Sequence, residues 1–147
     1  MFPSHGQIYQ YNGTELKKEK FSTQSFINEF NFKELPKDQI TWVNFYIMED
    51  LATIESFCKK EKYDALVFQN IKEKDNRPQF EDYGEYLFFS IRAAVPSTGI
   101  LRIHQEQLSF ILGENYIISF QSKPSDYFAS VRDRIENKKG IIRDKAT

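Results

Sequence analysis

The segment at residues 40–48, Ile-Thr-Trp-Val-Asn-Phe-Tyr-Ile-Met, constrains the fold of this chain more than any other feature. β-branched and aromatic residues fit the pleated surface of a sheet, so the segment favours a strand. A strand with one face in water alternates apolar and polar residues, whereas this segment has more apolar positions than that alternation needs. It therefore predicts a central strand that is buried on both faces of a sheet.

The residues before this strand indicate a hairpin and then an aromatic segment. Residues 8–21 contain Asn12-Gly13, a pair that suits a tight turn, and the lysines after the turn are typical of an edge strand. Residues 26–32 hold three phenylalanines and one isoleucine, a pattern compatible with either a helical turn or a strand. Pro36 should end that segment, because proline removes a backbone donor.

Two helices are expected after the central strand. Asp50 can cap the first, whose apolar residues recur at i, i+3 and i+7 as Leu51, Ile54 and Cys58. Asp64 can cap a second helix at residues 65–71. The polar segment 72–78, which ends in proline, then predicts a surface loop.

The last part of the chain predicts three strands and a helix. Residues 85–95, 100–112 and 116–121 are rich in strand-forming types, and the short links between them indicate an antiparallel meander. Ser125 can cap a final helix, which Gly140 should terminate. The apolar face of that helix consists of Phe128, Val131 and Ile135. The whole predicts an α/β or α+β fold, a mixed sheet packed with helices, in one domain spanning residues 1–147.

Composition excludes several functional classes. Twenty Lys and Arg stand against 21 Asp and Glu, so no overall positive field favours nucleic acid and we expect no such partner. One cysteine excludes an internal disulfide and fits a reducing compartment. No run approaches the roughly 20 apolar residues that cross a bilayer, and the N-terminal residues lack a secretory signal pattern.

Few residues show the spacing that catalysis or metal binding needs. His104 and Glu106 could form a weak pair, but a stable site usually takes three or four ligands. Cys58 and the many phenylalanines are interpreted as core. Acidic residues at 79–85 could attract Mg²⁺, although a solvated loop is the simpler interpretation. The common phosphate-loop, nucleophile-elbow and zinc-helix motifs do not occur in the sequence, so we expect no enzyme and no required cofactor.

Five short patterns follow one another along the chain. They are Thr41-Trp42-Val43-Asn44; Arg77-Pro78-Gln79-Phe80-Glu81-Asp82-Tyr83; Glu106-Gln107-Leu108-Ser109-Phe110-Ile111-Leu112; Phe120-Gln121; and Val131-Arg132-Asp133-Arg134-Ile135 with Gly140-Ile141-Ile142-Arg143. In this order and spacing they resemble the CorA family of divalent-cation transporters. The resemblance begins at Ile40 and continues to the end, whereas residues 1–39 carry no comparable motif.

The resemblance implies the cytoplasmic N-terminal domain of a magnesium transporter, with cobalt and nickel as further candidate cargo. Such a domain has a regulatory and assembly role in a homopentamer at the cytoplasmic face of the cell membrane. A stalk helix and two transmembrane helices would follow Thr147, so we expect this chain to be a fragment. Contact with the membrane would run only through those absent helices.

The resemblance also implies a regulatory divalent-cation region at the end of the second helix. The positions that match the acidic pair of well-studied relatives are Gln69 and Asn70 here. Amides lack the charge with which carboxylates hold Mg²⁺, so we expect a weakened or relocated site and weak Mg²⁺ binding. Asp64, Glu73 and Asp75 lie close in sequence and are candidate substitutes.

Two alternative functions stay open. The first is a zinc-transporting relative of the same family, because the pore that selects the ion is not in these residues. The second is a free-standing α/β ligand-binding or enzymatic domain, which would need a pocket with convergent titratable groups.

Overall fold

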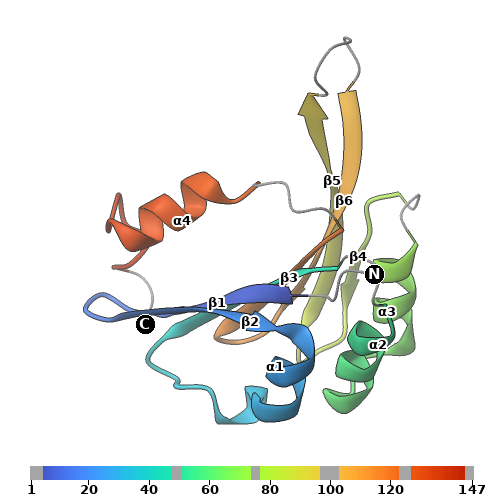
Figure 1. Ribbon diagram of the computed structural model, residues 1–147, viewed down its shortest axis with the longest axis horizontal. Helices are drawn as coiled ribbons and strands as arrows, with labels where there is room; N and C mark the ends of the chain where they lie inside the picture. Colours follow the sequence, from blue (N-terminus) through green and yellow to red (C-terminus); the bar gives the residue numbers. More distant parts are fainter. Residues whose placement is uncertain (1–4, 48–50, 74–76, 97–102, 123–126, 145–147) are drawn as a thin grey trace.

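The computed structural model describes residues 5–47, 51–73, 77–96, 103–122 and 127–144. At its centre is a seven-stranded sheet with the strand order β2-β1-β3-β7-β6-β5-β4 (Figure 1). The strands are β1 His5–Tyr11, β2 Leu16–Ser22, β3 Ile40–Tyr46, β4 Phe80–Asp82, β5 Leu87–Pro96, β6 Ile103–Leu112 and β7 Tyr116–Gln121. The helices are α1 Thr23–Glu29, the 3-10 turn η1 Phe32–Glu34, α2 Leu51–Lys60, α3 Ala65–Lys72 and α4 Ala129–Glu136. The predicted class, a mixed sheet with helices, is confirmed.

β1 and β2 form the predicted edge hairpin. The side-chain oxygen of Asn12 accepts hydrogen bonds from the backbone N–H groups of Thr14 and Glu15, at 2.9 and 2.7 Å, which fixes the turn. On the other side of β1, its backbone lies against β3. A Cβ at Gly6 would be only 2.2 Å from the carbonyl oxygen of Asn44, so this position admits glycine alone.

The aromatic segment that could be helix or strand is helical. Ser22 caps α1 by accepting a hydrogen bond from the backbone N–H of Ser25, at 3.4 Å. Phe26 stacks on Phe21 with ring centroids 4.1 Å apart. At the other end, the ammonium group of Lys60 in α2 donates to the carbonyl oxygen of Ile27. Packing against α2 and β2 therefore decides a choice that the local pattern leaves open.

β3 is the predicted central strand, since every residue from Thr41 to Tyr46 is buried. It pairs antiparallel with β1 and parallel with β7. A parallel pair needs a long crossover, and the chain from α2 to β6 supplies it. Met48, the last residue of the predicted strand, lies outside the described residues, as does Asp50, the predicted cap of α2.

β5, β6 and β7 form the predicted antiparallel meander. The prediction of a loop over residues 79–85 is wrong in part, because Phe80–Asp82 forms the edge strand β4 and pairs with β5. The turn that follows makes this possible: Gly84 has a φ of +87°, and its N–H donates to the Asp82 carboxylate at 2.8 Å. The side chains of β4 are exposed, as expected of that segment.

The two faces of the sheet are covered unequally. Helices α1, α2 and α3 pack on one face and α4 on the other (Figure 1). The larger core lies under α1–α3 and includes Phe45, Phe57 and Phe120. The smaller core lies under α4, where Ile135 packs with Tyr9, Tyr11 and Trp42.

A chain of buried polar side chains crosses the sheet on the α4 face. The indole N–H of Trp42 donates to the Ser119 hydroxyl at 2.9 Å, and this hydroxyl donates to the Asn44 amide oxygen at 2.5 Å. The Asn44 amide in turn donates to Gln121 at 2.7 Å. Because each group has a partner, these residues can be buried without the penalty of an unpaired polar atom.

Helix α4 begins later and ends earlier than predicted. Its N-cap residue is Phe128, without a side-chain cap, so the prediction that Ser125 caps it is wrong; Ser125 itself lies outside the described residues. Phe128 packs edge-on against Trp42, with centroids 5.4 Å apart, and this contact sets the start of the helix. At the other end, Lys138 has a φ of 51° and the N–H of Lys139 donates to the Arg134 carbonyl, which closes the helix before Gly140.

Candidate functional site

Asp64 lies at the N-terminal end of α3 and acts as the helix cap. Its carboxylate accepts a hydrogen bond from the backbone N–H of Leu66 at 2.9 Å, which confirms the predicted cap. Its own backbone N–H donates to the hydroxyl of Tyr86 at 2.8 Å. The Asp64 carboxylate therefore serves to cap α3.

Gln69, Asn70 and Glu73 lie together at the opposite end of α3. The Gln69 amide donates to the Glu73 carboxylate at 2.7 Å, one helical turn away. The backbone carbonyl of Asn70 accepts from the amide of Gln107 in β6 at 2.7 Å, which ties this end of the helix to the sheet. Asp75 lies outside the described residues.

The length of α3 separates the predicted ligands into two groups. A helix rises about 1.5 Å per residue, so Asp64 and Glu73, nine positions apart, are separated by roughly 13 Å along the axis. No single cation can be held by both carboxylates, because ligand distances to Mg²⁺ or Ca²⁺ are about 2.0–2.6 Å. The structure therefore brings together Gln69, Asn70 and Glu73 and leaves Asp64 apart.

Among the residues that the structure describes, this end of α3 carries one carboxylate, Glu73, and two neutral amides. Mg²⁺ is usually held through one or two carboxylates and keeps several of its waters. The Glu73 carboxylate already accepts a hydrogen bond from Gln69. Across the part of the chain that the structure describes, no group of three or more His, Cys, Asp or Glu residues is arranged to hold a metal.

The remaining chemical candidates are structural where they are described. Cys58 is buried, and burial raises the pKa of its thiol to about 12, which agrees with a core role. Glu106 is buried in β6 and accepts a hydrogen bond from the Ser122 hydroxyl at 3.0 Å. The side chain of His104, its predicted partner, lies outside the described part.

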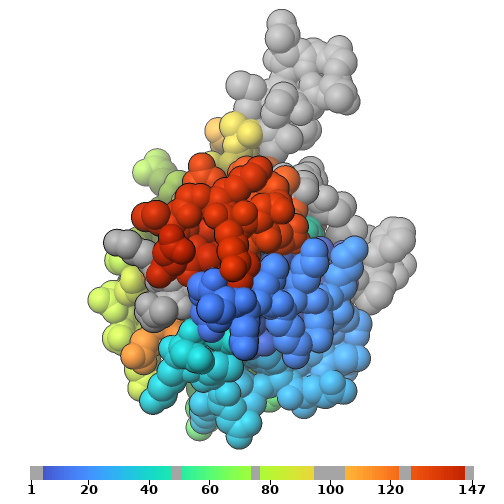
Figure 2. Space-filling view, turned by 90° about the vertical axis from the view of Figure 1, so that its left-hand side faces the viewer, coloured from blue at the N-terminus to red at the C-terminus, as the bar shows by residue number. Residues whose placement is uncertain are grey.

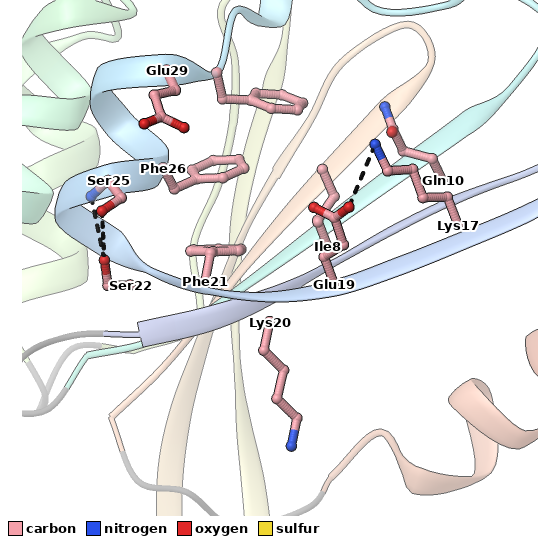
Figure 3. Close-up of a pocket in the computed structure, with 11 residues that line it drawn as sticks. Ile8, Gln10, Lys17, Glu19, Lys20, Phe21, Ser22, Ser25, Phe26 and Glu29 are labelled. Atoms are coloured by element: carbon pink, nitrogen blue, oxygen red, sulfur yellow. Dashed lines mark hydrogen bonds and ion pairs between the residues drawn. The ribbon is translucent and has the colours of Figure 1, made fainter.

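A hollow of about 480 Å³ lies between α1 and β2 (Figure 3). Its floor is apolar, with Ile8, Phe21 and Phe26, and its rim carries charges of both signs. Lys17 and Glu19 on that rim form an ion pair at 3.6 Å. With paired, opposite charges and no cluster of acids, this hollow has the character of a surface groove and not of a metal or catalytic centre.

Sequence reasoning assigned no role to Arg143, which is buried near the end of the described chain. Its guanidinium donates to backbone carbonyl oxygens of the β1–β2 turn and of α4. The sequence contains both partners of this contact, as the Gly140-Ile141-Ile142-Arg143 pattern and the Asn12-Gly13 turn. Nothing in the sequence indicates that the two lie together in the fold.

The sheet order and the helices on its two faces define the fold found in the soluble portion of CorA proteins. The solved soluble domain of CorA from Methanocaldococcus jannaschii has a TM-score of 0.60 and 15% identity, over 90% of this chain and 47% of that one. The cytoplasmic domain of ZntB from Vibrio parahaemolyticus also has a TM-score of 0.60, with 12% identity over 92% of this chain and 51% of that one.

The family described as "CorA-like Mg2+ transporter protein" matches residues 37–146, and the chain belongs to it. A curated relative, the cobalt/magnesium transport protein CorA of Thermotoga maritima, is 26% identical over 139 residues. That alignment covers 95% of this chain but only 38% of the relative. The predicted resemblance to the CorA family is thereby confirmed, and the chain spans well under half the length of this relative.

Proposed function

We propose that residues 1–147 form one noncatalytic domain of a divalent-cation transporter, placed at the cytoplasmic face of the membrane. The observation that carries this proposal is the family match over residues 37–146. The curated relative in the family is a cobalt/magnesium transport protein, which favours magnesium with cobalt as further cargo. Nickel stays a candidate from the family resemblance alone. Within residues 5–144 as far as described, no helix is long and apolar enough to cross a membrane. Because the chain covers only 38% of the curated relative, we assign the passage of ions to other parts of a longer protein.

In that longer protein the domain would contribute to assembly as a homopentamer and to cation-dependent regulation. Carboxylates that face each other across subunits repel unless a cation bridges them, so a cation can stabilise one assembled state. Here the corresponding end of α3 carries Gln69, Asn70 and Glu73, and where the acidic pair would place two carboxylates this chain has two amides, so there is less repulsion for a cation to offset. We infer that regulation of this domain by divalent cations is weakened, which we call the weakened sensor, and that it needs no tightly bound cofactor. Asp75 is a further candidate ligand, whereas the Asp64 carboxylate serves only to cap α3.

Calorimetric titration with Mg²⁺ tests this inference on the chain itself. The unchanged chain should give little heat, whereas the double variant Gln69→Glu, Asn70→Asp should bind at least about tenfold more tightly, because it adds two carboxylates beside Glu73. The matched control is Gln24→Glu, Asn28→Asp, the same exchange at exposed positions one turn apart on α1. Submicromolar binding by the unchanged chain, or an equal gain in the control, would contradict the weakened sensor.

A zinc-transporting relative is the second candidate, since the ZntB domain matches as well in fold as the CorA domain. Uptake of Mg²⁺, Co²⁺, Ni²⁺ and Zn²⁺ into vesicles that contain the complete reading frame separates the two. Uptake of Mg²⁺ supports the main proposal, and uptake of Zn²⁺ alone supports the second. A complete frame without membrane segments, or one that moves no cation, would leave the free-standing ligand-binding or enzymatic domain.

A further inference from the structure

Arg143 is a buried cation held by main-chain oxygens. Only 4% of the residue is exposed, and its guanidinium donates to the carbonyls of Asn12 and Glu15, each at 2.8 Å, and of Ile135 at 3.3 Å. Within the described residues it forms no ion pair with a carboxylate. Hydrogen bonds from a charged donor are stronger than neutral ones, and breaking them would leave the charge uncompensated in a buried place.

The β1–β2 turn presents two backbone carbonyl oxygens to this guanidinium. The side chain of Asn12 accepts the N–H groups of Thr14 and Glu15, and the Asn12 N–H donates to the Glu15 carbonyl at 3.0 Å. These bonds fix the turn and hold the Asn12 and Glu15 carbonyl oxygens where one guanidinium reaches both. Arginine suits such a site because its donors form a rigid planar fork.

The third carbonyl belongs to the last turn of α4. Helices end with carbonyl groups that have no partner within the helix, and a cation there is favourable. After α4 the chain reverses through Lys138 and Gly140, both with positive φ, which returns Arg143 to Ile135 and to the hairpin. Figures 1 and 2 show α4 and the segment after it beside the tip of the β1–β2 hairpin.

A second set of contacts joins the same elements at the surface. Glu136 accepts hydrogen bonds from the ammonium of Lys18 at 2.8 Å and from the hydroxyl of Tyr9 at 3.1 Å. The Lys18 side chain is 58% exposed, and exposed ion pairs contribute little. The buried contacts of Arg143 are therefore the stronger connection between hairpin and α4.

We propose that Arg143 is a positioning residue, a latch by which the β1–β2 hairpin fixes α4 and the path of the chain at Asp144. This gives a role to residues 5–22, which lie outside the matched range 37–146 and for which the family resemblance implies none. In a longer protein, a displacement of the hairpin would reach the following chain through this latch. That extension rests on the proposed function, whereas the latch itself does not.

Hydrogen exchange by mass spectrometry on the 147-residue chain tests the latch. In Arg143→Gln, amides near the hairpin turn and in α4 should exchange roughly tenfold faster or more, as expected for lost charge-assisted hydrogen bonds. Amides of α2, β5 and β6 should keep their rates. Quenching of Trp42 by acrylamide should rise as well, because this single tryptophan packs against Phe128 at the start of α4. The control Arg134→Gln changes an exposed arginine of α4 and should alter neither readout.

Asn12→Ala provides an independent variant that leaves Arg143 in place. It removes the side-chain acceptor that shapes the turn, so it should loosen the same two segments, and the double variant should exceed the larger single effect only slightly. Should Arg143→Gln fail to fold, Asn12→Ala and Arg143→Lys give the same comparison, with smaller effects. Equal acceleration over all segments, no acceleration in the hairpin, or additive effects of the two substitutions would each overturn the latch.

Discussion

Single residues at the centre of this sheet combine burial with polar chemistry. Asn44 and Ser119 are almost fully buried, yet each has hydrogen-bond partners in the chain that joins Trp42 to Gln121. An unpaired buried polar group costs about 1–3 kcal/mol of folding free energy. Substitution of any residue in this hydrogen-bonded chain would therefore also leave its hydrogen-bond partners unpaired. The Trp42–Asn44 pattern noted in the sequence is thus explained by one continuous hydrogen-bonded path between β3 and β7.

Cys58 gives a prediction at the same scale. Burial raises the pKa of its thiol to about 12, above its ordinary value, because the charged thiolate is disfavoured inside the core. At pH 8 only on the order of one thiol in 10⁴ would be ionised, and the thiolate is the reactive form. Ellman's reagent should therefore label the folded chain slowly and the denatured chain at once with one equivalent. Rapid labelling without denaturant would show that Cys58 is accessible, and Cys58→Ser serves as the blank.

At the scale of elements, β2 is an edge strand protected by charge. Within the described residues its outer backbone groups face no strand, and Lys18 and Lys20 lie on one side of the strand with Lys17 on the other. In an antiparallel pair of two β2 strands centred on Glu19, the two copies of Glu19 would oppose each other and Lys18 would oppose Lys20. Like charges directly opposite are unfavourable, so this composition disfavours self-pairing.

Replacing two of these lysines should allow molecules to associate through their β2 edges. Lys20→Thr removes the charge opposite Lys18, and Lys17→Thr adds a second strand-favouring residue, so the double variant should show a larger mass than the unchanged chain at equal concentration. Light scattering coupled to size-exclusion chromatography measures this. Lys59→Thr with Lys72→Thr makes the same change in charge on exposed helix surfaces and should leave the mass unaltered. If both variants behave alike, general surface charge and not the edge governs association.

The elements that could be predicted are those whose local pattern agrees with their environment. β3, the meander β5–β7 and the capped helix α3 follow from apolar runs, turn residues and Asp64. The start of α4 could not be predicted, because the contact of Phe128 with Trp42 outweighs the capping signal at Ser125. β4 was missed because its pairing depends on a turn at Gly84 and on β5. The place of the candidate cation region rests on the family resemblance and stays a prediction, whereas its separation from Asp64 follows from the length of α3.

At the scale of the whole molecule, the two faces of the sheet differ in how much they bury. The core under α1–α3 gathers most of the large buried side chains and extends from β1 to β5. The core under α4 is small and depends on Ile135 and a few aromatic neighbours. Regions with fewer buried contacts open locally at lower free energy than the rest of a protein. The α4 face should therefore open before the sheet unfolds.

Two truncations distinguish local from global opening. Phe57→Ala removes a ring from the larger core, so the free energy of global unfolding should fall by about 3–5 kcal/mol, and protected amides throughout the sheet should exchange faster. Ile135→Ala should chiefly speed exchange in α4 and in the β1–β2 hairpin, because the α4 core contacts those elements, while β5 and β6 keep their protection. Val131→Ala is the matched control and should have little effect on either region, because Val131 is exposed, although the sequence predicts it on the apolar face of α4. If Ile135→Ala accelerated β5 and β6 as much as α4, the two faces would form one cooperative unit, and α4 would be as much a part of the global fold as the helices on the opposite side.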